Sequence, residues 1–90
     1  MATTRRPHRP LPLGDTLPGF HGTFRVRSKT PRPGGGRRRR WKDPEGWIYE
    51  LDALHGTIEV FNPRGAHIGE FDPITGMQTK PANPTYSVEP

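Results

Sequence analysis

The stretch from Trp47 to Phe61 constrains the fold of this chain most strongly, because it alternates as two strands joined by a turn. In each arm, aromatic and aliphatic side chains alternate with polar ones, which is the pattern of half-buried β-strands. His55 and Gly56 lie between the arms, and glycine at the second central position suits a tight hairpin turn. The stretch therefore predicts a β-hairpin.

The register of this hairpin decides which polar side chains lie together. If Leu54 faces Thr57 across a two-residue loop, Asp52 lies directly opposite Glu59. Opposed side chains share a face of the sheet and have Cβ atoms about 5 Å apart. The expected register places two carboxylates on one face with the imidazole of His55 beside them. A slip of one residue would put the carboxylates on opposite faces.

The remaining patterns predict an antiparallel meander. Residues 23–28, 66–71 and 77–80 read as short strands, and no segment has a convincing helical pattern. We expect a mainly β fold, α+β at most, made of a small, highly twisted sheet. The expected organisation is a flexible basic Pro/Gly-rich arm over 1–36, a β domain over 37–80 and a Pro-rich tail over 81–90.

Hydrophobic side chains are few, so the assignment of each one matters. Only 29% of the 90 residues are hydrophobic, which allows one small core. In the strand over 23–28 we expect Phe24 and Val26 to point inward. Trp41 and Phe61 suit either a core or a base-stacking role. The side chains expected in the core are Trp47, Tyr49, Ile58, Val60 and Phe71.

Composition excludes several classes of protein. The chain has no cysteine, so a disulfide framework and a thiolate metal site are both excluded. No apolar run approaches the roughly 20 residues that span a bilayer. The N-terminus is basic but has no apolar segment, so it does not resemble a secretory signal.

Charge is divided unequally along the chain. Residues 1–42 carry twelve Lys and Arg against one acid, and residues 43–90 carry two against eight. A basic segment joined to an acidic one points to a polyanionic partner, most commonly a nucleic acid. The alternatives are a solvated basic run and a nuclear-type address. The candidate RNA-binding residues are Arg37, Arg38, Arg39, Arg40, Trp41, Lys42, Arg64 and Lys80.

Three side chains suggest acid–base catalysis. Asp52, His55 and Glu59 lie within eight residues of one another. RNA cleavage needs a base for the ribose 2′-hydroxyl, an acid for the leaving 5′-oxygen and positive charge at the phosphate. On an exposed sheet face such residues are usually just solvated. They could also bind a divalent metal, although a hairpin with one histidine makes a poor zinc site. His67 is expected to face away from Glu59 and to have a structural role.

Three blocks of the sequence resemble the cytotoxic domain of ribosome-inactivating E-group colicins and related pyocins. These blocks are Gly34–Trp41, Ile48–Glu59 and His67–Gly76, and they agree with that domain in order and spacing. The resemblance implies a compact, twisted antiparallel sheet with a short N-terminal helical region. It also implies cleavage of 16S ribosomal RNA in the decoding A site, without metal or cofactor.

The resemblance assigns roles to the three candidate catalytic residues. It implies that Glu59 is the general base, His55 the acid or its partner, and Asp52 the group that orients and charges the imidazole. The implied partners are the small ribosomal subunit with its RNA, and an acidic immunity protein. No membrane partner is expected, and we expect a monomer that acts in the cytoplasm of a target cell.

The chain departs from the family in two places. The family's tail carries a Lys-Arg pair whose arginine assists catalysis, whereas this chain has Thr85-Tyr86 there. The N-terminal region is rich in Pro and Arg, without a helical pattern. Without the tail arginine, either another arginine substitutes for it or catalysis is impaired. The sequence also shows no receptor-binding or translocation domain, which leaves a stand-alone toxin and a relative without its delivery parts both open.

Three functions are consistent with these observations. The first is a ribosome-targeting endoribonuclease, favoured by the intact set of Asp52, His55 and Glu59. The second is a non-catalytic RNA- or ribosome-binding relative, favoured by the missing tail arginine. The third is a protein-interaction module that uses the acidic face or the basic arm. Replacement of His55 by alanine separates catalysis from simple binding.

Overall fold

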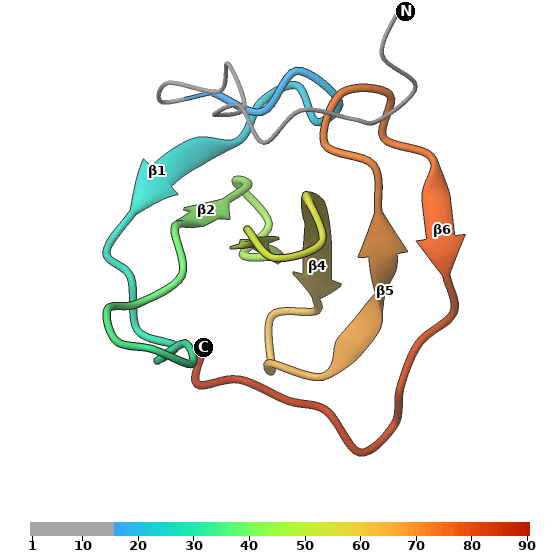
Figure 1. The fold of residues 1–90 in the computed structure, drawn as a ribbon. Coiled ribbons are helices and arrows are strands. Elements are labelled where there is room, and N and C mark those ends of the chain that lie inside the picture. The colour runs from blue at the N-terminus through green and yellow to red at the C-terminus, as the bar shows by residue number, and fades with distance from the viewer. Residues whose placement is uncertain (1–15) are drawn as a thin grey trace, which may run out of the picture.

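Six antiparallel strands form one sheet in the computed structural model, which describes residues 16–90. Each strand pairs with the next strand in the sequence, so the sheet is a meander (Figure 1). Residues 16–90 contain no helix, and therefore none that is long and apolar enough to cross a membrane. The predicted mainly β meander is confirmed. The strands are β1 (Phe24–Val26), β2 (Arg40–Lys42), β3 (Ile48–Asp52), β4 (Thr57–Phe61), β5 (His67–Phe71) and β6 (Gln78–Lys80).

The sheet is strongly curved, so that β1 and β6 lie on opposite sides of the fold (Figure 1). The register shifts between β4 and β5 and again between β5 and β6, and such irregularities increase the local twist. At one end of the sheet, the amide of Gly19 donates a hydrogen bond of 2.9 Å to the carbonyl of Pro73. This contact joins the segment before β1 to the turn before β6.

One face of the sheet carries the hydrophobic core. Its buried centre comes from a segment before β1 and from β2, β3 and β4, and partly buried side chains surround it. The centre consists of Leu17, Trp41, Leu51, Ile58 and Val60. The surrounding residues are Phe20, Trp47, Tyr49, Ile68 and Phe71, so all five predicted core residues are confirmed.

The hairpin of β3 and β4 is confirmed, but the predicted register is wrong. Asp52 pairs with Thr57 and Glu50 pairs with Glu59, so residues 53–56 form a longer turn than predicted. The carbonyl of Asp52 accepts a hydrogen bond of 2.7 Å from the amide of Gly56, which closes this turn. Because the displacement is two residues, Asp52 and Glu59 still share a face and lie diagonally rather than directly opposite each other.

The basic run contains a strand that its composition did not indicate. β2 pairs with both β1 and β3, and Trp41 lies opposite Tyr49 within the core face. In β1 the expected orientation is wrong, since Phe24 is half exposed. Arg25 lies opposite Trp41 instead, with its guanidinium carbon 5.3 Å from the indole centroid.

Two described segments outside the strands, around Leu17 and over the tail, pack against the sheet. The segment over 1–36 was expected to be a flexible arm, and its residues 1–15 lie outside the part of the chain that the structure describes. Leu17, in the described part, is only 2% exposed and belongs to the core. The tail over 81–90 passes back beside β5, and Figure 1 shows its end next to the loop before β2. Gly65 permits this approach, because its φ is +89° and a Cβ there would overlap the carbonyl of Val88.

Candidate active site

The face opposite the core carries four largely buried carboxylates on three neighbouring strands. They alternate with core residues, as the period of two requires. β3 contributes Glu50 and Asp52, β4 contributes Glu59, and β5 contributes Glu70; none is more than 8% exposed. Buried charges are costly unless they are paired. Each carboxylate accordingly has its own partner.

Asp52 holds His55 at the hairpin turn. The carboxylate Oδ2 of Asp52 lies 2.7 Å from Nδ1 of His55, and Oδ1 accepts a hydrogen bond of 3.3 Å from the His55 amide. An ionised carboxylate only accepts, so Nδ1 carries the proton in this pair. The imidazole is 58% exposed whereas the Asp52 side chain is 10% exposed. The pair therefore leaves Nε2 of His55 available for proton transfer.

The environment of Asp52 favours its charged form. Burial raises the pKa of Asp52, but the hydrogen bonds from the His55 side chain and amide lower it, and so do the positive charges of Arg38 and His55. The net effect is a pKa below the ordinary value of 3.8. Asp52 is therefore ionised at neutral pH and able to orient the imidazole.

Glu59 is paired with His67, contrary to the prediction that His67 faces away. Nε2 of His67 lies 2.7 Å from Oε1 of Glu59, and both side chains are buried. The reason is a β-bulge, in which Val60 pairs with Gly69 and Phe61 pairs with His67. Ile68 is the extra residue between these pairs, and it returns His67 to the face of Glu59.

The tautomer of His67 follows from its other nitrogen. Nδ1 of His67 accepts a hydrogen bond of 2.9 Å from the amide of Asn83 in the tail. A nitrogen that accepts from an amide carries no proton, so the proton of the neutral ring resides on Nε2. His67 thus donates to Glu59, which accepts. The sequence contained one signal of this arrangement, because a glycine inside a strand, here Gly69, often marks a bulge.

Arg40 and Glu50 form a buried ion pair beneath this face. Both side chains are 0% exposed, with Nη2 of Arg40 2.7 Å and Nε 2.8 Å from Oε2 of Glu50. Thr30 donates to the same oxygen at 2.7 Å, and Nη2 of Arg40 also donates to the Glu89 carbonyl at 2.7 Å. Arg40 therefore fastens the loop before β2 and the tail to the sheet.

Burial divides the candidate RNA-binding residues into two groups. Arg40 and Trp41 are 0% exposed, so neither side chain presents a surface to an RNA strand. Phe61 is equally buried. The other candidates are exposed or partly exposed, and they are Arg37, Arg38, Arg39, Lys42, Arg64 and Lys80. Among them Lys80 lies 3.9 Å from Oε1 of Glu70, and Arg38 lies beside the Asp52–His55 pair.

Tyr86 lies over the carboxylate face, a contact that the sequence did not indicate. Its ring packs against Phe61 and His67, with centroid distances of 5.2 Å and 5.0 Å. Its hydroxyl accepts a hydrogen bond of 3.2 Å from Nη1 of Arg38. The tail returns to the sheet here, where the amide of His67 donates to the Tyr86 carbonyl at 3.1 Å.

The Tyr86 hydroxyl keeps its proton at neutral pH. Burial raises its pKa, the charge of Arg38 lowers it, and the nearby carboxylates raise it, with a net upward shift. A protonated hydroxyl that accepts from Arg38 still has its own hydrogen to donate. Tyr86 thus links Arg38, in the loop before β2, to the face of the sheet that carries the carboxylates.

Asp52 and Glu59 share a face of the sheet, and His55 in the turn is directly paired with Asp52. Within residues 16–90, no group of three or more His, Cys, Asp or Glu side chains is placed to hold a metal ion. The geometry instead offers a charged Asp52, an exposed imidazole and a carboxylate positioned by a second imidazole. These are the groups that general acid–base chemistry uses.

Comparisons with known proteins identify the family of this chain. Residues 10–89 match the family described as Cytotoxic. The chain is 41% identical to colicin E3 of Escherichia coli over 80 residues, which are 86% of this chain and 13% of that protein. It is 37% identical to cloacin and 35% identical to colicin-E6 of the same organism, over 89% and 91% of this chain. In both cases it spans 15% of the relative's length. The chain therefore belongs to the family of cytotoxic ribonuclease domains found in the E-group colicins.

Proposed function

We propose that this chain is a ribosome-targeting endoribonuclease that cleaves 16S ribosomal RNA in the decoding A site and so inhibits translation. The observation that carries the proposal is the Asp52–His55 pair on the same sheet face as Glu59, in a chain of this family. We assign cleavage to side-chain acid–base chemistry, without a metal or cofactor. The site of action would be the cytoplasm of a target cell, where the ribosomes lie.

Each of the three residues has a separate role in the proposed reaction. Glu59 takes the proton of a ribose 2′-hydroxyl, whose oxygen then attacks the adjacent phosphorus. The bond from phosphorus to the 5′-oxygen breaks, and Nε2 of His55 gives its proton to that oxygen. The products are a 2′,3′-cyclic phosphate and a free 5′-hydroxyl. Asp52 holds Nδ1 of His55 and stabilises the charged imidazole.

Arg38 supplies the positive charge that the reacting phosphate requires. In the resembling domains a tail arginine has this role, and Tyr86 occupies its place here. The Tyr86 hydroxyl accepts from Arg38 at 3.2 Å, and Arg38 lines the same pocket as Asp52 and His55. A guanidinium fixed beside a site of developing negative charge stabilises the transition state. Arg38 therefore offsets the loss of the tail arginine.

The exposed cations complete the proposed RNA interface. Lys and Arg side chains that contact phosphates release counterions, which makes RNA binding sensitive to salt. Burial removes Arg40 and Trp41 from this interface. The residues that remain are Arg37, Arg38, Arg39, Lys42, Arg64 and Lys80. An acidic immunity protein would compete for the same basic surface, and the active protein would be a monomer.

Incubation with intact bacterial ribosomes tests the proposal. The unsubstituted protein, His55→Ala and Glu59→Gln are compared on RNA gels, with His21→Ala as a matched exposed histidine outside the site. We expect one discrete 3′ fragment from the unsubstituted protein and from His21→Ala, and intact RNA from the other two.

The same experiment separates the alternatives. Intact RNA together with co-sedimentation of the folded protein would favour a non-catalytic ribosome-binding relative, the function that the missing tail arginine supports. Intact RNA without co-sedimentation would exclude both ribosome-directed functions and leave a protein-interaction module.

A further inference from the structure

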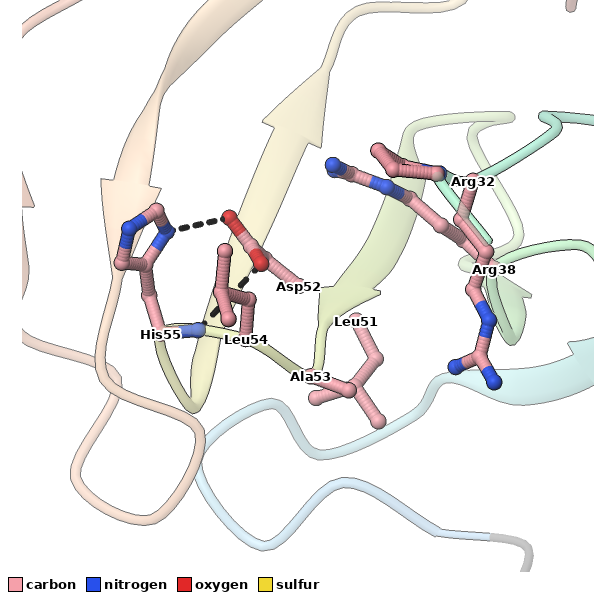
Figure 2. Close-up of a pocket in the computed structure, with 8 residues that line it drawn as sticks. Arg32, Arg38, Leu51, Asp52, Ala53, Leu54 and His55 are labelled. Carbon is pink, nitrogen blue, oxygen red and sulfur yellow. Dashed lines mark hydrogen bonds and ion pairs between the residues drawn. The ribbon is translucent and has the colours of Figure 1, made fainter. Parts of the chain in front are cut away.

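A pocket opens beside the Asp52–His55 pair, between the β3–β4 turn and the loop before β2. Its volume is about 430 Å³, within the range of about 300–1,000 Å³ that is typical of small-molecule sites. Figure 2 shows His55 and Asp52 on one side of the pocket and two arginines on the other. The lining residues are Arg32, Pro33, Arg38, Leu51, Asp52, Ala53, Leu54 and His55.

One wall of the pocket is apolar and exposed. Leu54 is 80% exposed at the tip of the turn, and Ala53 beside it is also exposed. Turn positions of this kind are usually polar or glycine, so a leucine beside the imidazole needs an explanation. An apolar wall of aliphatic groups suits the face of a flat, weakly polar ring, such as a nucleobase.

The opposite wall is cationic. Nε of Arg32 donates to the carbonyl of Gly35 at 3.0 Å, and Nη1 of Arg38 donates to Tyr86 at 3.2 Å. These bonds hold both side chains in place, and among the contacts within residues 16–90 each engages one of the five guanidinium donors. Arginine recognises phosphate through paired donors. The pocket thus combines a surface for a ring with fixed donors for a phosphate.

We propose that this pocket binds one unpaired nucleotide of the RNA substrate, next to the scissile phosphate. The base would lie against Leu54 and Ala53, and the phosphate of this nucleotide would contact Arg38 and Arg32. A base inside a duplex presents only its edges, so the nucleotide must be turned out of its stack to enter. The inference rests on the proposed function. It adds that one nucleotide of the substrate, held in this pocket, positions the RNA backbone at His55.

Binding of single nucleotides tests the pocket directly. Nucleoside 5′-monophosphates contain no phosphodiester, so the unsubstituted protein is titrated with them while amide NMR signals are followed. Ribose 5-phosphate is the matched ligand without a base, and inorganic phosphate is the ligand without either. We expect the signals of Ala53, Leu54 and Arg38 to shift, with at least threefold tighter binding of the nucleotides than of ribose 5-phosphate.

Two variants separate the apolar wall from the cations. Leu54→Asn should weaken nucleotide binding by about three- to tenfold through loss of apolar contact, and leave binding of ribose 5-phosphate unchanged. Met77→Asn, which alters another exposed hydrophobic side chain in the turn before β6, is the control and should change neither. Equal binding of nucleotides and ribose 5-phosphate, or an equal effect of both variants, would overturn the proposal.

Failure of the pocket and failure of the proposed function give different results. If the pocket positions the substrate, Leu54→Asn raises KM for ribosome cleavage with little change in kcat. Nucleotide binding at Leu54 by a protein that leaves ribosomes intact would remove the nuclease function and keep the binding site. Ribosome cleavage without any base-dependent binding would keep the nuclease and remove the pocket.

Discussion

His67 on β5 donates a hydrogen bond of 2.7 Å from Nε2 to Oε1 of Glu59 on β4, and the bulge at Ile68 makes this contact possible. The amide of Asn83 fixes the ring by donating to Nδ1 at 2.9 Å. A buried carboxylate that is to act as a base is thereby held in one orientation. His67 is accordingly a positioning residue in the proposed mechanism.

Replacement of His67 tests this positioning role. His67→Ala should lower kcat for RNA cleavage by about 10- to 100-fold, because the proposed base loses its orientation. His67→Gln offers an amide donor to Glu59 and an oxygen to Asn83, and should recover most of the rate. Single-turnover cleavage, with circular dichroism to confirm folding, measures both variants. Equal losses in the two variants would indicate a purely structural histidine.

The buried pair of Arg40 and Glu50 should dominate stability rather than RNA binding. Arg40→Met leaves Glu50 as an unpaired buried charge, which should lower the free energy of unfolding by about 3–5 kcal/mol. The double variant Arg40→Met/Glu50→Met should recover much of this loss, because Arg40 Nη1 and Glu50 Oε1 lack partners among residues 16–90. Urea unfolding measures both, and an unchanged midpoint for Arg40→Met would contradict the assignment.

Exposed arginines in the same basic run should contribute to RNA binding rather than to stability. Arg37→Ala and Arg39→Ala should change stability by less than about 0.5 kcal/mol, since both side chains are exposed. Each should reduce the slope of log affinity against log salt by about one unit if it contacts a phosphate. Ribosome co-sedimentation over a salt series measures the slope. A slope that equals that of the unsubstituted protein would remove the residue from the interface.

Asp52 should contribute stability that depends on pH. Its pKa in the folded protein is lowered below the ordinary value of 3.8, so the folded state favours the ionised form. This contribution is fully present well above 3.8 and is lost as the pH falls through the lower folded-state pKa. Asp52→Asn should therefore destabilise the protein at neutral pH and flatten the decline of stability in acid. Unfolding free energies measured from pH 7 downward test this, and parallel curves for the two proteins would refute it.

The Tyr86 hydroxyl should matter more for cleavage than for folding. Tyr86→Phe keeps the ring against Phe61 and His67 but removes the acceptor for Arg38. We expect kcat to fall by about 3- to 30-fold through loosening of Arg38, with a loss of stability near 1 kcal/mol. Arg38→Ala should reduce kcat further, and Tyr86→Phe should add little in that background. Additive effects of the two substitutions would show that the residues act independently.

Alternation in the sequence determined the class of the fold and most of the core. Strands β3, β4, β5 and β6 follow from runs with a period of two between Gly, Pro and Asn turns, because those patterns are local. The same period placed Asp52 and Glu59 on one face even though the predicted register was two residues out. An even displacement keeps each side chain on its face, so Asp52 and Glu59 share a face although the turn is two residues longer than predicted.

Tertiary structure alone decided the contacts between residues that are distant in sequence. A bulge reverses the parity of a strand, so His67 could be assigned to the face of Glu59 only once the pairing of β5 was known. Arg40 and Trp41 read as part of an exposed basic run, and only the docking of β2 between β1 and β3 buries them. Tyr86 reaches Arg38 across 48 residues of sequence. Local patterns specify which side chains share a face of a strand. The groups that each face contacts are set by how the whole chain packs.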